Sequence, residues 1–307
     1  MSILVIGSFM MDLVVRTPRA PEKGETVIGE SFSRFPGGKG ANQAVSAARL
    51  SGKVTMVGKV GDDEYGNEAI ETLKQERINT DYILRDYKHP TGVGVITLEN
   101  SGDNRIVVIP GANLAYTEDE LSTIKYLIKN SKILVVQLEM NLSMVHKAVT
   151  YAFMQQVPVI LNPAPAQVLS DELLGKVTYL TPNETEAELL TGIKVRSMED
   201  AENAGKVLLN KGVKNVIITL GENGALLVNH AGTYHVPGFS VKPYDTVAAG
   251  DAFNGALAVG ISNGKPLIDV VRYANAVGAL TVTKEGAIPS LPRIDEVEAF
   301  MKNYTVN

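Results

Sequence analysis

Short apolar runs rich in valine and isoleucine alternate with segments in which apolar residues recur every three or four positions. The apolar runs predict buried strands at 3–8, 54–61, 132–139, 157–165, 177–183 and 215–221. The intervening segments predict helices, including 41–52, 63–78 and one that follows a capping-box pattern at Thr117 and Glu120. This alternation is typical of an α/β fold in which helices cover both faces of a mostly parallel sheet.

Two regions depart from this alternation. Residues 12–36 and 91–109 contain short strand-like runs joined by turns rich in Gly, Asn and Asp, with no helix between them. We therefore expect an α/β core formed by residues 1–11, 37–90 and 110–307, with the two inserted regions forming one small β-sheet. A small sheet near the carboxyl ends of the parallel strands is well placed to act as a lid.

Composition narrows the class of protein. The 307 residues carry a net charge of -5, which disfavours a general binder of nucleic acid or acidic membranes, although a local basic patch could still hold a phosphate. The chain has no cysteine, which excludes disulfides and thiolate catalysis, and its four histidines lack the spacing of a helical zinc site. The start of the chain lacks a basic leader and no apolar run reaches the length of a membrane span. We therefore expect a cytoplasmic protein with no nucleic-acid or membrane partner.

Two glycine-containing stretches before predicted helices could each approach an anion. In "FPGGKGANQA" (35–44), glycines let a ligand approach the backbone and the helix start offers free N–H groups, although the pattern also suits a plain tight turn. In "YDTVAAGDAFNG" (244–255), the amides at the helix start would form an anion cradle: those of Ala248, Ala249 and Gly250. Asp251 would then be poised to take a proton from an attacking hydroxyl, or would only complement the helix dipole.

Two other motifs have a structural interpretation. Asn183 and Glu186 in "TPNETEAELL" have the spacing of a capping box, so their side chains need not bind a ligand. "GISNG" (260–264) matches the G-x-S-x-G pattern of serine hydrolases. A predicted helix, not the strand that this motif requires, precedes Ser262, so we do not expect a nucleophilic serine.

Seven stretches together resemble the motifs of bacterial ribokinases in the PfkB carbohydrate-kinase family: "GGKGAN", "QLE", "NPAPA", "TPNETEAELLTG", "ITLGENG", "DTVAAGDAFNGAL" and "TVTKEGAIPSLP". They occur in the family's order over essentially the whole chain. The resemblance implies a Rossmann-like α/β core and a β lid that usually mediates a homodimer. It also implies ATP-dependent phosphorylation of the terminal hydroxyl of a sugar.

The resemblance implies a role for each motif. Asp251 would activate the 5-hydroxyl of a pentose, and the amides of Ala248 to Gly250 would stabilise the transferred phosphoryl group. The implied sugar contacts are Met10, Asp12, Gly38, Lys39, Gly40, Asn42, Glu139 and Asp251. The implied nucleotide contacts are Asn183, Glu186, Thr219, Gly221, Gly224, Gly250 and Asn275, the first two lying near the waters of Mg²⁺.

The resemblance also implies a monovalent-cation site, usually filled by K⁺, beside the anion cradle. Asp245 and Ser290 would contribute side chains to it. The implied carbonyl ligands belong to Val247, Thr281, Lys284 and Gly286. Hard oxygen ligands suit an alkali cation, so Asp245 is interpreted as a cation ligand and not as a second catalytic acid.

One residue departs from the ribokinase pattern. Ribokinases carry Asn-x-Asp after the first strand, where this chain reads Met10-Met11-Asp12. The Asn normally bonds a ribose hydroxyl near C2, and a thioether cannot replace that bond. An unpaired buried hydroxyl costs about 1–3 kcal/mol, which favours 2-deoxy-D-ribose over ribose unless Met10 is turned away.

Other functions stay open at this point. Within the same class, the substrate could be ribose, another pentose or a nucleoside. From another class, the chain could be a non-catalytic sugar-binding protein on a kinase scaffold. The retained Asp251 and the intact anion cradle argue against that second interpretation.

Overall fold

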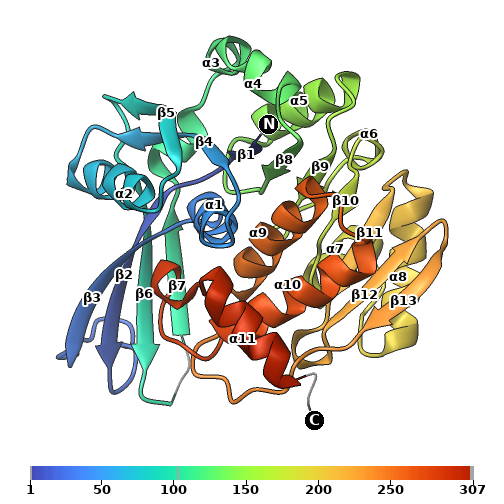
Figure 1. Ribbon diagram of the computed structural model, residues 1–307. Helices are drawn as coiled ribbons and strands as arrows, with labels where there is room; N and C mark the ends of the chain where they lie inside the picture. The colour runs from blue at the N-terminus through green and yellow to red at the C-terminus, as the bar shows by residue number, and fades with distance from the viewer. Residues whose placement is uncertain (1, 102–103, 305–307) are drawn as a thin grey trace.

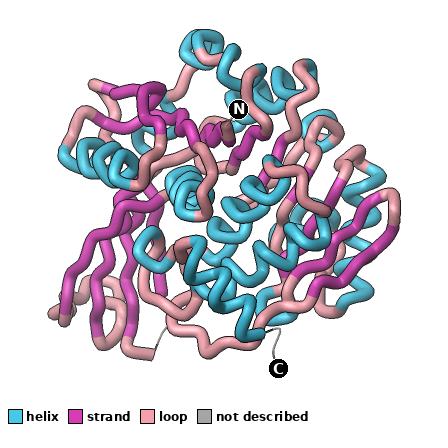
Figure 2. The backbone as a smooth tube through the Cα atoms, in the orientation of Figure 1, coloured by secondary structure: helices cyan, strands magenta, loops and turns pink. Residues whose placement is uncertain are grey.

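The computed structural model describes residues 2–101 and 104–304. The chain forms one large sheet, one small sheet and the helices that pack on them (Figure 1). Figure 2 shows helices on both sides of the large sheet, with the strands of the small sheet standing to one side. None of the helices in these residues is long and apolar enough to cross a bilayer.

The large sheet has nine strands, and all neighbours from β11 to β5 run parallel. In spatial order the strands are β13 (Gly232–Val236), β12 (Ala225–Asn229), β11 (Asn215–Thr219), β10 (Tyr179–Leu180), β9 (Val159–Leu161), β8 (Ile133–Val136), β1 (Ile3–Ile6), β4 (Val54–Gly61) and β5 (Asn79–Asp86). The predicted α/β fold is confirmed. The sequence pattern did not predict β5, because this edge strand carries many polar residues and lacks a continuous apolar run. It also did not predict the antiparallel pair β12–β13.

The two faces of the large sheet feed separate hydrophobic cores. Ile3 and Val5 of β1 enter one core and Leu4 and Ile6 enter the other, as the two-residue period of a strand requires. The first core is covered by α1 (Lys39–Arg49), α2 (Glu64–Gln75), α9 (Ala249–Ser262), α10 (Leu267–Thr281) and α11 (Ile294–Tyr304). The second is covered by α3 (Glu118–Thr123), α4 (Lys125–Lys129), α5 (Leu142–Met154), α6 (Asp171–Leu174), α7 (Glu184–Thr191) and α8 (Met198–Asn210). The predicted capping box at Thr117 is present at the start of α3.

The small sheet draws its strands from both inserted regions, although β2 begins at Met10 and β3 ends at Gly37, just outside the predicted range 12–36. Its order is β3 (Ser31–Gly37), β2 (Met10–Thr17), β6 (Gly92–Glu99) and β7 (Asn104–Ile109), with β2 and β6 parallel and both outer pairs antiparallel. The backbone of Phe9, between β1 and β2, is held at its N–H and its carbonyl by the side chain of Asn113. This buried contact joins the small sheet to the core at a defined point.

Helices α1 and α9 lie against each other close to the end of β1. A Cβ at Gly40 would lie 2.5 Å from the amide nitrogen of Ser8, so only glycine lets α1 come this near to the chain that leaves β1. On the other side, a Cβ at Gly255 would lie 2.5 Å from Oγ of Ser46, and that hydroxyl donates to the carbonyl of Ala252 at 3.0 Å. The starts of both helices are thereby brought to the carboxyl ends of the parallel strands, where ligands bind in open α/β sheets.

Candidate active site

Helix α9 begins without a side-chain cap. Its N-cap residue, Ala248, has a φ of 61°, a left-handed conformation that is costly for a residue with a Cβ. Gly250 is exposed, with nothing within 4 Å of its missing Cβ. The amide groups of an uncapped first turn have no intrahelical partner, so this end of α9 suits a bound anion.

Asp251 lies one residue further on and is buried. Its Oδ2 accepts a hydrogen bond of 2.9 Å from the side chain of Asn42, and its Oδ1 accepts one of 2.9 Å from the side chain of Gln43. Both donors are neutral amides of α1. The carboxylate is therefore oriented by hydrogen bonds without being paired to a cation, and each oxygen keeps a lone pair that could accept a proton.

Asn42 also has an unused acceptor. Its Oδ1 is buried and has no hydrogen-bond partner among the described residues. A Cβ at Gly37 would lie 3.9 Å from this oxygen and 2.6 Å from Oδ2 of Asp12, so all three groups share one small space. An unpaired buried acceptor beside a carboxylate fits a ligand that supplies hydroxyl donors, such as a sugar.

Strand β2 places Met10 and Asp12 on one face of the small sheet. The pairing of β2 with β3 and β6 is continuous, with no bulge, so residues two apart point to the same side. The carboxylate of Asp12 lies over the flanking strands, close to Gly37 and Gly94. Met10 is buried, and its register places it on the face of the sheet that carries Asp12.

The side chains of Glu139 and Ser8 accept hydrogen bonds from the first amides of α1. Glu139 Oε2 accepts from the amide of Lys39 at 2.9 Å and from the hydroxyl of Ser8, while Ser8 Oγ accepts from the amide of Gly40 at 3.2 Å. The amides of Lys39 and Gly40 in the "GGKGAN" loop are therefore satisfied within the protein, which favours the alternative of a plain tight turn at these two residues. Gly38 has a φ of 91° and its missing Cβ would lie 2.8 Å from the Met10 amide nitrogen, so this glycine serves backbone geometry.

One lysine faces four carboxylates across the site. Burial lowers the pKa of Lys39, but the charges of Asp251, Glu139, Glu186 and Asp12 outweigh burial and raise it. Burial, together with the charges of Glu139 and Asp251, raises the pKa of Asp12 to about 6. Burial also raises the pKa values of Glu139 and Glu186. The site therefore holds more acidic than basic side chains, an electrostatic setting that opposes a bound polyphosphate.

The predicted nucleotide residues surround the ends of β10, β11 and β13. Asn183 and Glu186 form a complete capping box at the start of α7, which confirms the structural interpretation of these two residues. Thr219 pairs with Asn183 in an isolated bridge and ends β11, next to the 3₁₀ turn η2 (Gly221–Asn223). Two predicted contacts have backbone or anchoring roles. Gly224 closely approaches Gly238, and the Nδ2 of Asn275 donates to the carbonyls of Val236 and Pro237.

The predicted cation ligands lie on two loops that Asp245 joins. Its Oδ1 accepts from the amide of Val247 at 3.0 Å and its Oδ2 accepts from the amide of Gly286 at 2.9 Å. Ser290, in the 3₁₀ turn η3 (Ile288–Ser290), is buried, as is Thr281 at the end of α10. The side chain of Lys284 points to Glu296, which leaves only its carbonyl for a cation. Carboxylate, hydroxyl and carbonyl oxygens on two joined loops fit an alkali ion.

A divalent ion would find fewer protein ligands here than the alkali ion would. Among residues 2–101 and 104–304, no three or more His, Asp, Glu or Cys side chains are grouped to hold a metal ion. Magnesium in kinases is commonly held by one or two carboxylates, water and the phosphates of the substrate. Glu186 is buried, and its carboxylate interacts electrostatically with Lys39 and with Asp251 in the first turn of α9, which fits that limited role.

Some polar residues at the site were not identified from the sequence. Gln43, Gln137, Asn162, Thr181 and Asn254 are all buried and hydrogen-bonded to one another near Asp251. All five lie inside motifs already quoted, but a single polar side chain gives no sequence signal of what it contacts. Ser262, by contrast, is the last residue of α9 and donates to the carbonyl of Val259, as a residue at a helix end would.

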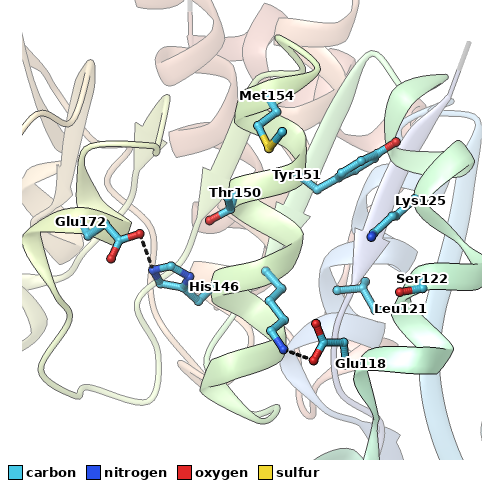
Figure 3. Close-up of a pocket in the computed structure, with 10 residues that line it drawn as sticks. Glu118, Leu121, Ser122, Lys125, His146, Thr150, Tyr151, Met154 and Glu172 are labelled. Carbon is cyan, nitrogen blue, oxygen red and sulfur yellow. Dashed lines mark ion pairs between the residues drawn. The ribbon is translucent and has the colours of Figure 1, made fainter.

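A cavity of about 250 Å³ lies elsewhere, among the helices that cover the second core (Figure 3). Its charged side chains bind one another: Lys147 pairs with Glu118, and His146 lies 3.6 Å from Glu172. Lys125 lies over the ring of Tyr151.

Comparison with known proteins agrees with this geometry. The model of the pfkB family carbohydrate kinases matches residues 1–294. A ribokinase of Haemophilus influenzae is 39% identical over 302 residues, and a deoxyribokinase of Salmonella typhimurium is 37% identical over 302 residues; each alignment covers 98% of this chain and 99% of the relative. The structure of a ribokinase from Thermotoga maritima has a TM-score of 0.91 at 38% identity, covering 98% of this chain and 99% of that one. The structure of an Arabidopsis thaliana ribokinase complexed with ribose and ATP has a TM-score of 0.92 at 32% identity, covering 98% of each chain.

The fold is thus that of a sugar kinase of the ribokinase type. The chain belongs to the pfkB family of carbohydrate kinases. ATP is the nucleotide of this family, as the Arabidopsis complex illustrates. Relatives named ribokinase and deoxyribokinase are almost equally similar, so overall similarity does not separate the two sugars.

Proposed function

We propose that this protein transfers the γ-phosphoryl group of ATP to the 5-hydroxyl of 2-deoxy-D-ribose, producing 2-deoxy-D-ribose 5-phosphate. Asp251 takes the proton of that hydroxyl as its oxygen attacks the γ-phosphorus and the bond to ADP breaks. The first-turn amides of α9 stabilise the charge that develops on the phosphoryl oxygens. The observation that supports this chemistry is the buried carboxylate of Asp251, which accepts hydrogen bonds from two side-chain amides and lies in the first turn of a helix without a side-chain cap.

The remaining ligands surround this centre. Asp12, Asn42 and Glu139 offer acceptors to the sugar hydroxyls, while Lys39 adds the one nearby positive side chain. The nucleotide lies against Asn183, Glu186, Thr219, the turn from Gly221 to Gly224, and Asn275. Magnesium bound to the phosphates would neutralise part of their negative charge, which the four carboxylates otherwise repel. Glu186 would lie near the waters of this ion.

The choice of sugar rests on Met10. Its register places it on the face of β2 that carries Asp12, and it is buried, which supports its interpretation as part of the sugar surface. A thioether next to the C2 position leaves a ribose hydroxyl unpaired, at a cost of about 1–3 kcal/mol. Ribose remains the second candidate, since the relatives named ribokinase are as similar as the deoxyribokinase.

Replacing the proposed base tests the chemistry. Wild-type protein should release ADP from Mg-ATP only when the sugar is added. Asp251→Asn should lower kcat by about 10³-fold, because general-base catalysis contributes about 10²–10⁴. Coupled measurement of ADP gives both rates. Ser262→Ala serves as the control and should keep the wild-type rate. Wild-type protein that binds sugar but never turns over would identify a non-catalytic binding protein instead.

Restoring the ribokinase residue tests the choice of sugar. Wild-type kcat/KM should favour deoxyribose over ribose by about tenfold or more, and Met10→Asn should shift that ratio toward ribose by about tenfold. Met10→Leu is the matched control, because it stays apolar and should keep the preference. An unchanged ratio in Met10→Asn would refute the role given to Met10.

A potassium ion is proposed between the loops that carry Asp245 and Gly286. Its charge would steady the loop that leads into α9. Replacing K⁺ by Na⁺ or Cs⁺ in the assay should lower kcat/KM by about tenfold, and Asp245→Asn should blunt that response, since the amide loses the charge but keeps an acceptor. Equal rates in all three salts would remove the cation site from the proposal.

A homodimer through the small sheet is also proposed. Strand β7 is a free edge, and Ile106, Val107, Val108 and Ile109 on it are 53%, 63%, 49% and 44% exposed. An exposed apolar edge strand is a site for pairing with a second chain. Sedimentation velocity should show a dimer for the wild type and a monomer for Ile106→Lys. Val168→Lys, at an exposed apolar position outside the sheet, should remain dimeric; a monomeric wild type contradicts the proposal.

A further inference from the structure

A chain of buried amides lies behind Asp251. Gln137 Nε2 donates to Gln43 Oε1 at 2.7 Å, and Gln43 Nε2 donates both to Asn162 Oδ1 at 3.1 Å and to Asp251 Oδ1 at 2.9 Å. Asn162 Nδ2 donates to the backbone carbonyl of Thr181 at 3.3 Å. Gln43 is fully buried, with an exposed fraction of 0%, so its side chain serves only this interior network.

The direction of every bond in this chain follows from one backbone group. The carbonyl of Thr181 can only accept, which turns the Nδ2 of Asn162 toward it and the Oδ1 of Asn162 toward Gln43. Gln43 must therefore present its Nε2, and the donation from Gln137 to its Oε1 holds the same orientation. No member of the chain from Gln137 to Thr181 titrates. Asp251 thus always faces a donor.

A second branch joins the network to the anion cradle. The hydroxyl of Thr181 donates to Asn254 Oδ1 at 2.7 Å, and Asn254 Nδ2 donates to the carbonyl of Gly250 at 2.8 Å. The same residue, Thr181, therefore positions the first turn of α9 and, through Asn162 and Gln43, the carboxylate of Asp251. The carboxylate and the amides of the first turn are held relative to each other by one set of bonds.

We propose that Gln43 is a positioning residue that sets the rotation of the Asp251 carboxylate toward the attacking hydroxyl. This inference rests on the proposed function, in which Asp251 is the base. Gln43 acts through Asp251 alone and, being buried, does not bind the sugar or the nucleotide. Its loss should therefore affect the chemical step and leave substrate binding nearly unchanged.

Gln43→Met tests this directly, because methionine keeps the length of the side chain but cannot donate. We expect kcat to fall about 10²-fold, with KM for sugar and for ATP within about threefold of wild type. Ser46→Ala is the matched control. Ser46 lies one turn further along α1, is equally buried and bonds the carbonyl of Ala252, so its loss weakens the same helix pair without touching Asp251. Its kcat should stay near that of the wild type.

A double-mutant cycle distinguishes positioning from a general structural effect. In the Asp251→Asn background, Gln43→Met should cost less than about threefold, measured with radiolabelled ATP, since the group that it orients is gone. An equal loss in both backgrounds, or wild-type kcat in Gln43→Met, would overturn the proposal. If Gln43→Met does not fold, Gln137→Met tests the same proposal. It leaves the bond from Gln43 to Asp251 in place but removes the hydrogen bond that Gln43 Oε1 accepts from Gln137. It should lower kcat severalfold with KM unchanged, and an unchanged kcat would overturn the proposal.

The proposed function fails separately. A wild-type protein with no sugar-dependent ADP release, or an Asp251→Asn variant with full activity, would refute the kinase chemistry itself. Wild-type activity with an inactive Asp251→Asn variant and a fully active Gln43→Met variant would refute only the role of Gln43.

Discussion

The rest of the site depends on how the buried carboxylate of Asp251 is held. Each of its oxygens accepts a hydrogen bond from a neutral side-chain amide and not from a cation. The two amides orient the carboxylate and leave a lone pair on each oxygen. They come from consecutive residues of α1, so the site depends on how closely α1 packs against α9. That distance is set by Gly255, where a Cβ would clash with Ser46, while Gly40 lets the other side of α1 approach the chain that leaves β1.

The electrostatics of the site support the cations proposed for it. Four carboxylates face one lysine, and burial together with neighbouring carboxylates raises the pKa values of three of them, Asp12, Glu139 and Glu186. Such a site attracts hydroxyl groups but repels a polyphosphate. The uncapped end of α9 supplies positive potential at one point only. Oxygen ligands on the loops of Asp245 and Gly286, directly before α9 and after α10, lie where an additional cation would act on the same helix start.

The proposed sugar surface is shared between the core and the small sheet. Asn42 and Glu139 belong to the core, whereas Met10 and Asp12 belong to the first strand of the small sheet. Only residues 7–9 separate that strand from β1, and Asn113 holds the junction at Phe9. Met10, proposed to select the sugar, and Asp251, proposed as the base, therefore lie on different elements.

Much of this protein follows from the sequence alone. The alternation of apolar runs and helical segments predicts the α/β core, and the two turn-rich insertions predict the small sheet, because periodicity and turn chemistry are local properties. The capping boxes at Thr117 and Asn183 are local for the same reason. The order of the motifs along the whole chain predicts the family, and the family motifs imply where its ligands bind.

Only the tertiary structure shows which groups are already in use. The amides at the start of α1 look free in the sequence. In the structure the amide of Lys39 donates to Glu139 and that of Gly40 donates to Ser8, and both acceptors are far away along the chain. Gln43, Asn162 and Thr181 look like unremarkable polar residues until three separate elements bring them together behind Asp251. The physical reason is that the orientation of a buried hydrogen-bonding group depends on partners far along the chain, and no local pattern in the sequence records them.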